Sequence, residues 1–102
     1  MNYSQIEQIM LSYGLKKHEI SEGTNFTYTK KGKHRIILER LRLLTQGGVG
    51  GFLYVELLDE YKNICSKNGH INVKGIGNEE ELRNIVEKII NVLETSWKIV
   101  IS

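Results

Sequence analysis

The chain has 102 residues, of which 40% are hydrophobic and 25% are charged, and its formal net charge is +2. This length allows one domain with one hydrophobic core, and the ordinary balance of apolar and charged residues excludes a wholly disordered chain. No stretch approaches the roughly 18 uninterrupted apolar residues of a membrane-spanning helix, so we expect no membrane partner.

Cysteine content and the N-terminal segment indicate location. The single cysteine, Cys65, excludes an internal disulfide or a multi-cysteine zinc site. The segment MNYSQIEQIML lacks a basic stretch followed by an apolar run, so we expect no signal peptide and a reduced, cytoplasmic location. Ala and Pro are absent, whereas Ile, Lys and Asn, which have AT-rich codons, are abundant. We infer an origin in a low-GC bacterium, a phage or a mobile element.

The first predicted element is a helix of about ten residues. Ser4 and Glu7 have the spacing of a capping box, and Gly14 is suited to the left-handed position after the helix. Leu15 would fold back on Met10 at that end. The residues that recur on one face are Ile6, Ile9, Met10 and Tyr13.

A hairpin is predicted next. Residues 25–29 alternate aromatic side chains with threonines, which indicates a strand. A three-residue loop at 30–32, with Gly32 left-handed, would pair Thr29 with Lys33. The opposing pairs in this register are Phe26 with Ile36 and Tyr28 with His34. The side chains expected on the core face are Phe26, Tyr28, Ile36 and Leu38.

The alternation fails farther along the second strand. Beyond Leu38, a regular strand would direct Arg40 and Arg42 toward the core. A β-bulge near Glu39–Arg40 would instead return Leu41 and Leu43 to that side. We therefore predict a bulge at this point.

Residues 52–58, FLYVELL, form a β-rich run without polar alternation, which predicts a central strand, and residues 59–63 indicate a turn. Asn68–Gly69 is a strong two-residue turn pair and predicts a second hairpin. Pairing Lys67 with His70 would place three apolar side chains on one face. These are Ile64, Ile71 and Val73.

The last helix is predicted over residues 79–95, with Asn78 as the N-cap and Glu81 three residues later. Its apolar stripe consists of Leu82, Ile85, Val86, Ile89, Ile90 and Leu93. Residues 96–102 would close the chain as a short strand, and Trp97 would be a core or rim aromatic.

Together these elements predict a single α+β domain over residues 1–102. Its sheet would be mainly antiparallel, with about five to six strands. The N-terminal helix and the longer C-terminal helix would pack on one face of it. The other face would be more polar, and the basic hairpin would lie at an edge.

Four glycines fall close together at Gly47, Gly48, Gly50 and Gly51. A phosphate-binding loop of the Walker type needs a following Lys-Ser/Thr pair and a helix N-terminus, and neither follows here. We interpret the stretch as a flexible loop connecting two strands. A moving flap over a groove is the alternative.

The main electrostatic feature is the segment 30–42, which carries a formal charge of +5. Its cations are Lys30, Lys31, Lys33, Arg35, Arg40 and Arg42. They could contact phosphates, with His34 or Tyr28 near bases or sugars. However, residues 52–102 carry a charge of −2, which is unusual for a dedicated nucleic-acid-binding domain. A solvated edge strand, nucleic acid and an acidic protein partner therefore remain open as explanations.

Catalytic and metal-binding patterns are weak. In the predicted second hairpin Cys65 opposes Asn72 and lies diagonal to His70, which are ingredients of thiol catalysis. A diagonal pair is roughly 7–8 Å apart, too far for a hydrogen bond. His18 and Glu22 have a possible ligand spacing but lack further ligands nearby. We therefore expect no catalytic residues, metal or cofactor.

The function predicted from the sequence is a small non-catalytic interaction module. It would bind a protein partner, or itself, through the open sheet face or an edge strand. Weak nucleic-acid binding through the basic hairpin is the alternative. A thiol-dependent enzyme is a remote one.

Overall fold

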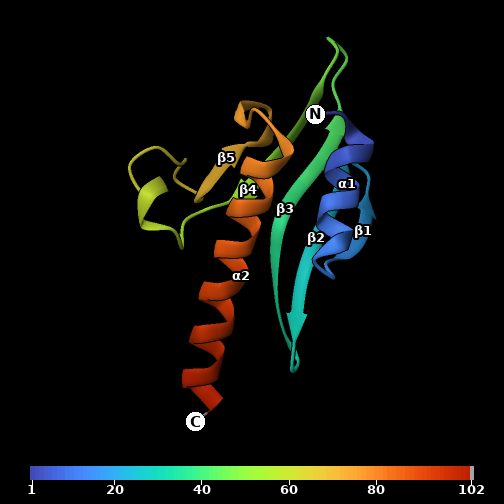
Figure 1. Cartoon of the computed structure of the whole chain (residues 1–102). Coiled ribbons are helices and arrows are strands. Elements are labelled where there is room, and N and C mark those ends of the chain that lie inside the picture. The colour runs from blue at the N-terminus through green and yellow to red at the C-terminus, as the bar shows by residue number, and fades with distance from the viewer. Residues whose placement is uncertain (102) are drawn as a thin grey trace.

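The computed structural model describes the backbone of residues 1–101 and the side chains of residues 1–96. Five strands form one antiparallel sheet whose spatial order is the order along the chain (Figure 1). The strands are β1 (Lys16–Ile20), β2 (Gly23–Lys30), β3 (Lys33–Leu43), β4 (Val49–Tyr54) and β5 (His70–Asn72). Helix α1 (Tyr3–Ser12) precedes the sheet and the longer helix α2 (Glu79–Ile101) follows it. The predicted α+β class is confirmed.

Helix α1 is capped at both ends by local hydrogen bonds. Asn2 accepts from the backbone N–H of Gln5, and the Gln5 side chain accepts from the N–H of Asn2. This capping box starts two residues before the predicted Ser4–Glu7 pair, so that prediction is wrong. At the other end Gly14 has φ +77° and the N–H of Leu15 donates to Met10 O, as predicted for a left-handed glycine cap.

The turn between β2 and β3 has two residues rather than the three predicted. Lys31 and Gly32 both have positive φ, at 52° and 83°, and Lys30 pairs with Lys33. Two consecutive left-handed residues match the right-handed twist of a hairpin, which explains why Lys31 tolerates this conformation. The true opposing pairs are Phe26 with Leu38 and Tyr28 with Arg35.

The predicted bulge at Glu39–Arg40 is confirmed. Arg40 has φ +54° and the pairing of β3 with both neighbours shifts there. Leu41 is consequently buried, but Leu43 is 72% exposed, so its predicted core position is wrong. A second irregularity beside Phe26 buries Ile37 and leaves Ile36 exposed. The predicted position of Ile36 on the core face is therefore wrong.

The second half of the sheet differs from the prediction. Strand β4 ends at Tyr54, and the following segment contains a short 3-10 helix, η1 (Asp59–Tyr61). Residues 64–67 form no strand, and β5 pairs with β4 instead, placing Tyr54 opposite His70. The turn at Gly69 exists, but its carbonyl accepts from the N–H of Val55, and this contact with the end of β4 organises the loop.

The glycine stretch is a corner followed by a strand. Gly47 and Gly48 have φ of +93° and +82°, and the N–H of Leu44 donates to Gly48 O across the turn. Gly50 and Gly51 lie within β4 and are buried. A Cβ on Gly51 would lie 3.3 Å from the Cα of Leu41, so glycine allows β3 and β4 to approach here.

One core joins both helices to one face of the sheet, and Figure 1 shows α1 and α2 on the same side of it. The fully buried side chains include Ile6, Ile9, Met10, Phe26, Leu38, Leu41, Leu53, Leu82 and Ile89. Asn78 caps α2 as predicted by accepting from the N–H of Glu81. The hydroxyl of Tyr13, the C-cap residue of α1, donates to the carboxylate of Glu87 on α2 at 3.0 Å.

Two predictions about the strands of the sheet are wrong. Strand β1, whose five residues are all exposed, lies outside β2, so the basic hairpin β2–β3 occupies the interior of the sheet. Residues 96–101 continue α2 instead of forming a strand. A helix satisfies its own backbone hydrogen bonds, whereas a strand needs a neighbouring strand. Ser102 and the Trp97 side chain lie outside the described part of the chain.

Within the part of the chain that the structure describes, no helix has the length and apolar character required to cross a membrane.

Candidate binding surface

Two aromatic rings lie on the face of the sheet opposite the helices. Phe52 and Tyr54 flank Leu53 on β4, and Leu53 is completely buried in the core. Because successive side chains of a strand point to opposite faces, Phe52 and Tyr54 are on the open face. Both are only partly buried. His70 on β5 packs edge-on against both rings, with centroid distances of 6.1 Å to Phe52 and 5.9 Å to Tyr54.

Three arginines from β3 cover these rings. The guanidinium carbon of Arg40 lies 4.5 Å from the centroid of Phe52, and that of Arg42 lies 5.9 Å from it. The guanidinium carbon of Arg35 lies 4.8 Å from the centroid of Tyr54. Each distance is within the range of cation–π attraction. We call Arg35, Arg40, Arg42, Phe52, Tyr54 and His70 the Arg–aromatic surface.

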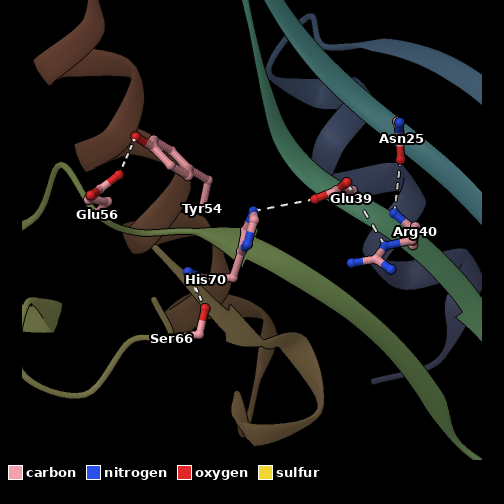
Figure 2. A network of polar contacts seen from close by, with 7 residues as sticks. All are labelled: Asn25, Glu39, Arg40, Tyr54, Glu56, Ser66 and His70. Carbon is pink, nitrogen blue, oxygen red and sulfur yellow. Dashed lines mark hydrogen bonds and ion pairs between the residues drawn. The ribbon is translucent and has the colours of Figure 1, made fainter. Parts of the chain in front are cut away.

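The bulge positions the central arginine. Asn25 on β2 accepts a hydrogen bond from the backbone N–H of Arg40 at 2.9 Å, and Figure 2 shows this contact. The guanidinium of Arg42 donates to the carbonyl of Arg40 at 3.0 Å. The Nε of Arg40 is buried and has no hydrogen-bond partner among the described residues. Two hydrogen bonds therefore hold the backbone of Arg40 at the bulge, while its side chain remains 38% exposed.

One carboxylate lies within this group of cations. Glu39 is paired across the sheet with Phe52, and its Oε2 lies 3.4 Å from Nε2 of His70 (Figure 2). Its other oxygen is 3.9 Å from Nε of Arg40. The carboxylate of Glu56 also contacts this surface through the hydroxyl of Tyr54. Three guanidinium groups against two carboxylates leave the surface with a formal charge of +1.

The Tyr54 phenol is held in its neutral form. Burial raises its pKa above 10.0, and its hydrogen bond to Glu56, 2.9 Å long, raises the pKa further, although Arg35 opposes this. Arg35 therefore lies over the face of a neutral phenol ring, whose quadrupole attracts the cation. A hollow of about 270 Å³ next to this ring is lined by His34, Arg35, Ile36, Tyr54, Asn68 and His70.

The six cations predicted as one binding segment lie in three different environments. Arg35, Arg40 and Arg42 join the Arg–aromatic surface. Lys31 and Lys33 lie at the tip of the hairpin, away from these rings. Lys30 forms an ion pair of 2.7 Å with Glu94 on α2, and this hydrogen bond raises the pKa of Lys30.

Sequence reasoning missed Phe52, Tyr54 and His70 as surface residues. The run 52–58 lacks polar alternation and predicts only a central strand, without indicating which of its side chains lie on the open face. The signal that could have identified them is the position of Phe52 and Tyr54 two residues apart, beside a predicted strand rich in arginine. His70 could be placed only by knowing that β5 pairs with β4.

Cys65 has a different environment from the one predicted. It is not on a strand, and its Sγ donates to the carbonyl of Lys62 at 3.8 Å. Cys65, His70 and Asn72 do line a common hollow of about 600 Å³. The imidazole of His70, however, contacts Glu39 and the two aromatic rings. Among the described residues, no group of three or more His, Cys, Asp or Glu is arranged to hold a metal.

Comparison of this chain with protein-family models, with curated proteins and with solved structures finds no match.

Proposed function

We propose that this protein is a non-catalytic binding module that engages an anionic macromolecule through its Arg–aromatic surface. The observation that carries the proposal is the stacking of three arginines on two ring faces of an open sheet. Arg and aromatic residues are the types most enriched among the residues that dominate binding energy at interfaces.

The geometry favours binding in two ways. Stacking on Tyr54 and Phe52 restricts the side chains of Arg35 and Arg42 before a partner arrives, so less conformational entropy is lost on binding. The planar guanidinium also presents paired donors that match carboxylate and phosphate groups. Arg40 can take this role because its side chain is 38% exposed where it lies over Phe52.

Charge supports an anionic partner. The three arginines outnumber the two carboxylates beside the rings, Glu39 and Glu56, and the contacts of Glu39 to His70 and Arg40 offset its repulsion of an anion. Complementary charge increases association rates and disfavours cationic competitors. The hydrogen bond from Cys65 to a main-chain carbonyl supports binding rather than thiol catalysis.

Retention on immobilised heparin, a sulfated polyanion, tests this proposal. The double variant Arg40→Gln/Arg42→Gln should elute at clearly lower salt than the wild type. The matched control Lys31→Gln/Lys33→Gln removes the same charge from the hairpin tip and should elute close to the wild type. Circular dichroism would verify that both variants are folded.

Equal loss of retention in the two double variants would mean that net charge alone governs binding, and the proposal would be wrong. Arg83→Gln provides a second control, because Arg83 lies on α2 in the helical layer on the other face of the sheet.

A further inference from the structure

We propose that the anionic partner is single-stranded nucleic acid, with bases stacked on Phe52 and Tyr54. This inference rests on the proposed function above and specifies its partner. It differs from the hairpin hypothesis because the binding residues come from β3, β4 and β5 rather than from residues 30–42 alone.

The first argument is the spacing of the rings. Phe52 and Tyr54 are two residues apart on β4, so their Cα atoms are about 7 Å apart on the same face. Sheets that bind single strands use aromatic side chains on an open face to stack two or three bases. Two rings and the adjacent His70 provide a platform of that kind.

The second argument is an exchange of stacking partners. Arg40 and Arg42 both lie over Phe52 in the free protein. The Arg40 side chain is 38% exposed, and base stacking on an aromatic ring is a stronger interaction than the cation–π contact of a partly exposed arginine. An incoming base would therefore displace the guanidinium of Arg40 from the ring. The released guanidinium would remain beside the base and bind its phosphate.

The third argument separates single strands from duplexes and acidic proteins. A duplex keeps its bases stacked on one another, so it would contact the arginines but could not stack a base on either ring. Acidic side chains of a protein would do the same. The hollow beside Tyr54 adds the side chains of Asn68 and His70, which have hydrogen-bonding groups for the edge of a base.

Fluorescence anisotropy provides the test, using a labelled 12-nucleotide strand of mixed sequence as RNA, as DNA and as a duplex. We expect both single strands to bind more tightly than the duplex. Phe52→Leu should weaken single-strand binding by about 5- to 150-fold, the range for loss of one stacked base. Tyr54→Leu should behave similarly, whereas Tyr54→Phe, which keeps the ring, should bind like the wild type.

Salt dependence distinguishes the two kinds of contact. Arg40→Gln should reduce the slope of log affinity against log salt by about 0.7, the value for one phosphate contact on a single strand. Phe52→Leu should leave the slope unchanged, because stacking releases no counterions. Arg83→Gln is the charge-matched control for Arg40→Gln and should alter neither affinity nor slope.

The outcomes separate the two proposals. If Phe52→Leu and Tyr54→Leu bind single strands as tightly as the wild type while Arg40→Gln/Arg42→Gln does not, the stacking inference is overturned and the anion-binding function stands. If no oligonucleotide binds but heparin retention still requires Arg40 and Arg42, nucleic acid is excluded and an acidic protein becomes the partner. If heparin retention is also insensitive to these arginines, both proposals fail.

Discussion

The guanidinium of Arg40 lies 4.5 Å from the ring centroid of Phe52, although Arg40 would face the core in a regular strand. The bulge in β3 removes this conflict, because it buries Leu41 and releases Arg40 to the open face. A local irregularity of the backbone therefore protects the core from a charge and builds the candidate binding surface at the same time.

Asn25 should be required for the stability of this bulge. In Asn25→Ala the backbone N–H of Arg40 loses its acceptor in a partly buried position, which should lower the free energy of unfolding by ~1–3 kcal/mol. Asn25→Asp keeps an acceptor oxygen, so its free energy of unfolding should decrease less than that of Asn25→Ala. Urea denaturation measures both. Equal losses in the two variants would show that the hydrogen bond is not the cause.

Ile89 should anchor α2 against the sheet. Its side chain is completely buried, and Ile89→Ala should lower the free energy of unfolding by ~2–5 kcal/mol because it leaves a cavity in the core. Asn91→Ala, at an exposed position of the same helix, should change stability by no more than about 0.5 kcal/mol. Chemical denaturation of both variants checks this. A loss below about 1 kcal/mol for Ile89→Ala would contradict the packing described here.

Glycine should be essential at position 23 and replaceable at position 50. Gly23 has φ +143°, and a Cβ there would lie 2.8 Å from the carbonyl oxygen of Leu41. Backbone strain alone should lower the free energy of unfolding of Gly23→Ala by ~1–3 kcal/mol. At Gly50 the nearest atom would be Cδ2 of Leu44 at 2.9 Å, the end of a side chain that is able to move. Thermal unfolding should therefore show a larger decrease in Tm for Gly23→Ala than for Gly50→Ala. A larger loss of stability for Gly50→Ala than for Gly23→Ala would contradict this prediction.

The contact between the basic hairpin and α2 should weaken at alkaline pH. The hydrogen bond to Glu94 raises the pKa of Lys30 above 10.5, and burial followed by a hydrogen bond to Glu94 raises the pKa of Tyr28 above 10.0. A raised pKa in the folded state contributes stability that is complete below the unfolded value and is lost as pH rises through the folded value. The free energy of unfolding should therefore fall as pH rises above 10.0.

Urea denaturation between about pH 8 and pH 11 measures this decline. The Glu94→Gln variant removes the carboxylate that raises both pKa values, so its decline should be shallower than that of the wild type. Because burial also raises the pKa of Tyr54, part of the decline should remain in this variant. An identical pH profile in the two proteins would exclude a role for Glu94.

Periodicity and turn residues were sufficient to predict much of the fold. The apolar stripe of α2, its Asn78 cap and the Gly14 cap depend on residues a few positions apart, and all three are confirmed. The bulge at Glu39–Arg40 was predictable because a charge in the core would be too costly. Strand β1 was missed because its exposed residues leave no apolar alternation to detect.

The sequence by itself determined the α+β class, the two helices and the concentration of cations on one strand, because these follow from local periodicity and composition. Only the tertiary structure decided which cations meet the aromatic rings. Register depends on a two-residue turn, two irregularities in β3 and the pairing of β5 with β4, and each shift moves side chains between faces. Arg40, Phe52 and His70 come from three strands, so their encounter is a property of strand pairing that no local pattern encodes.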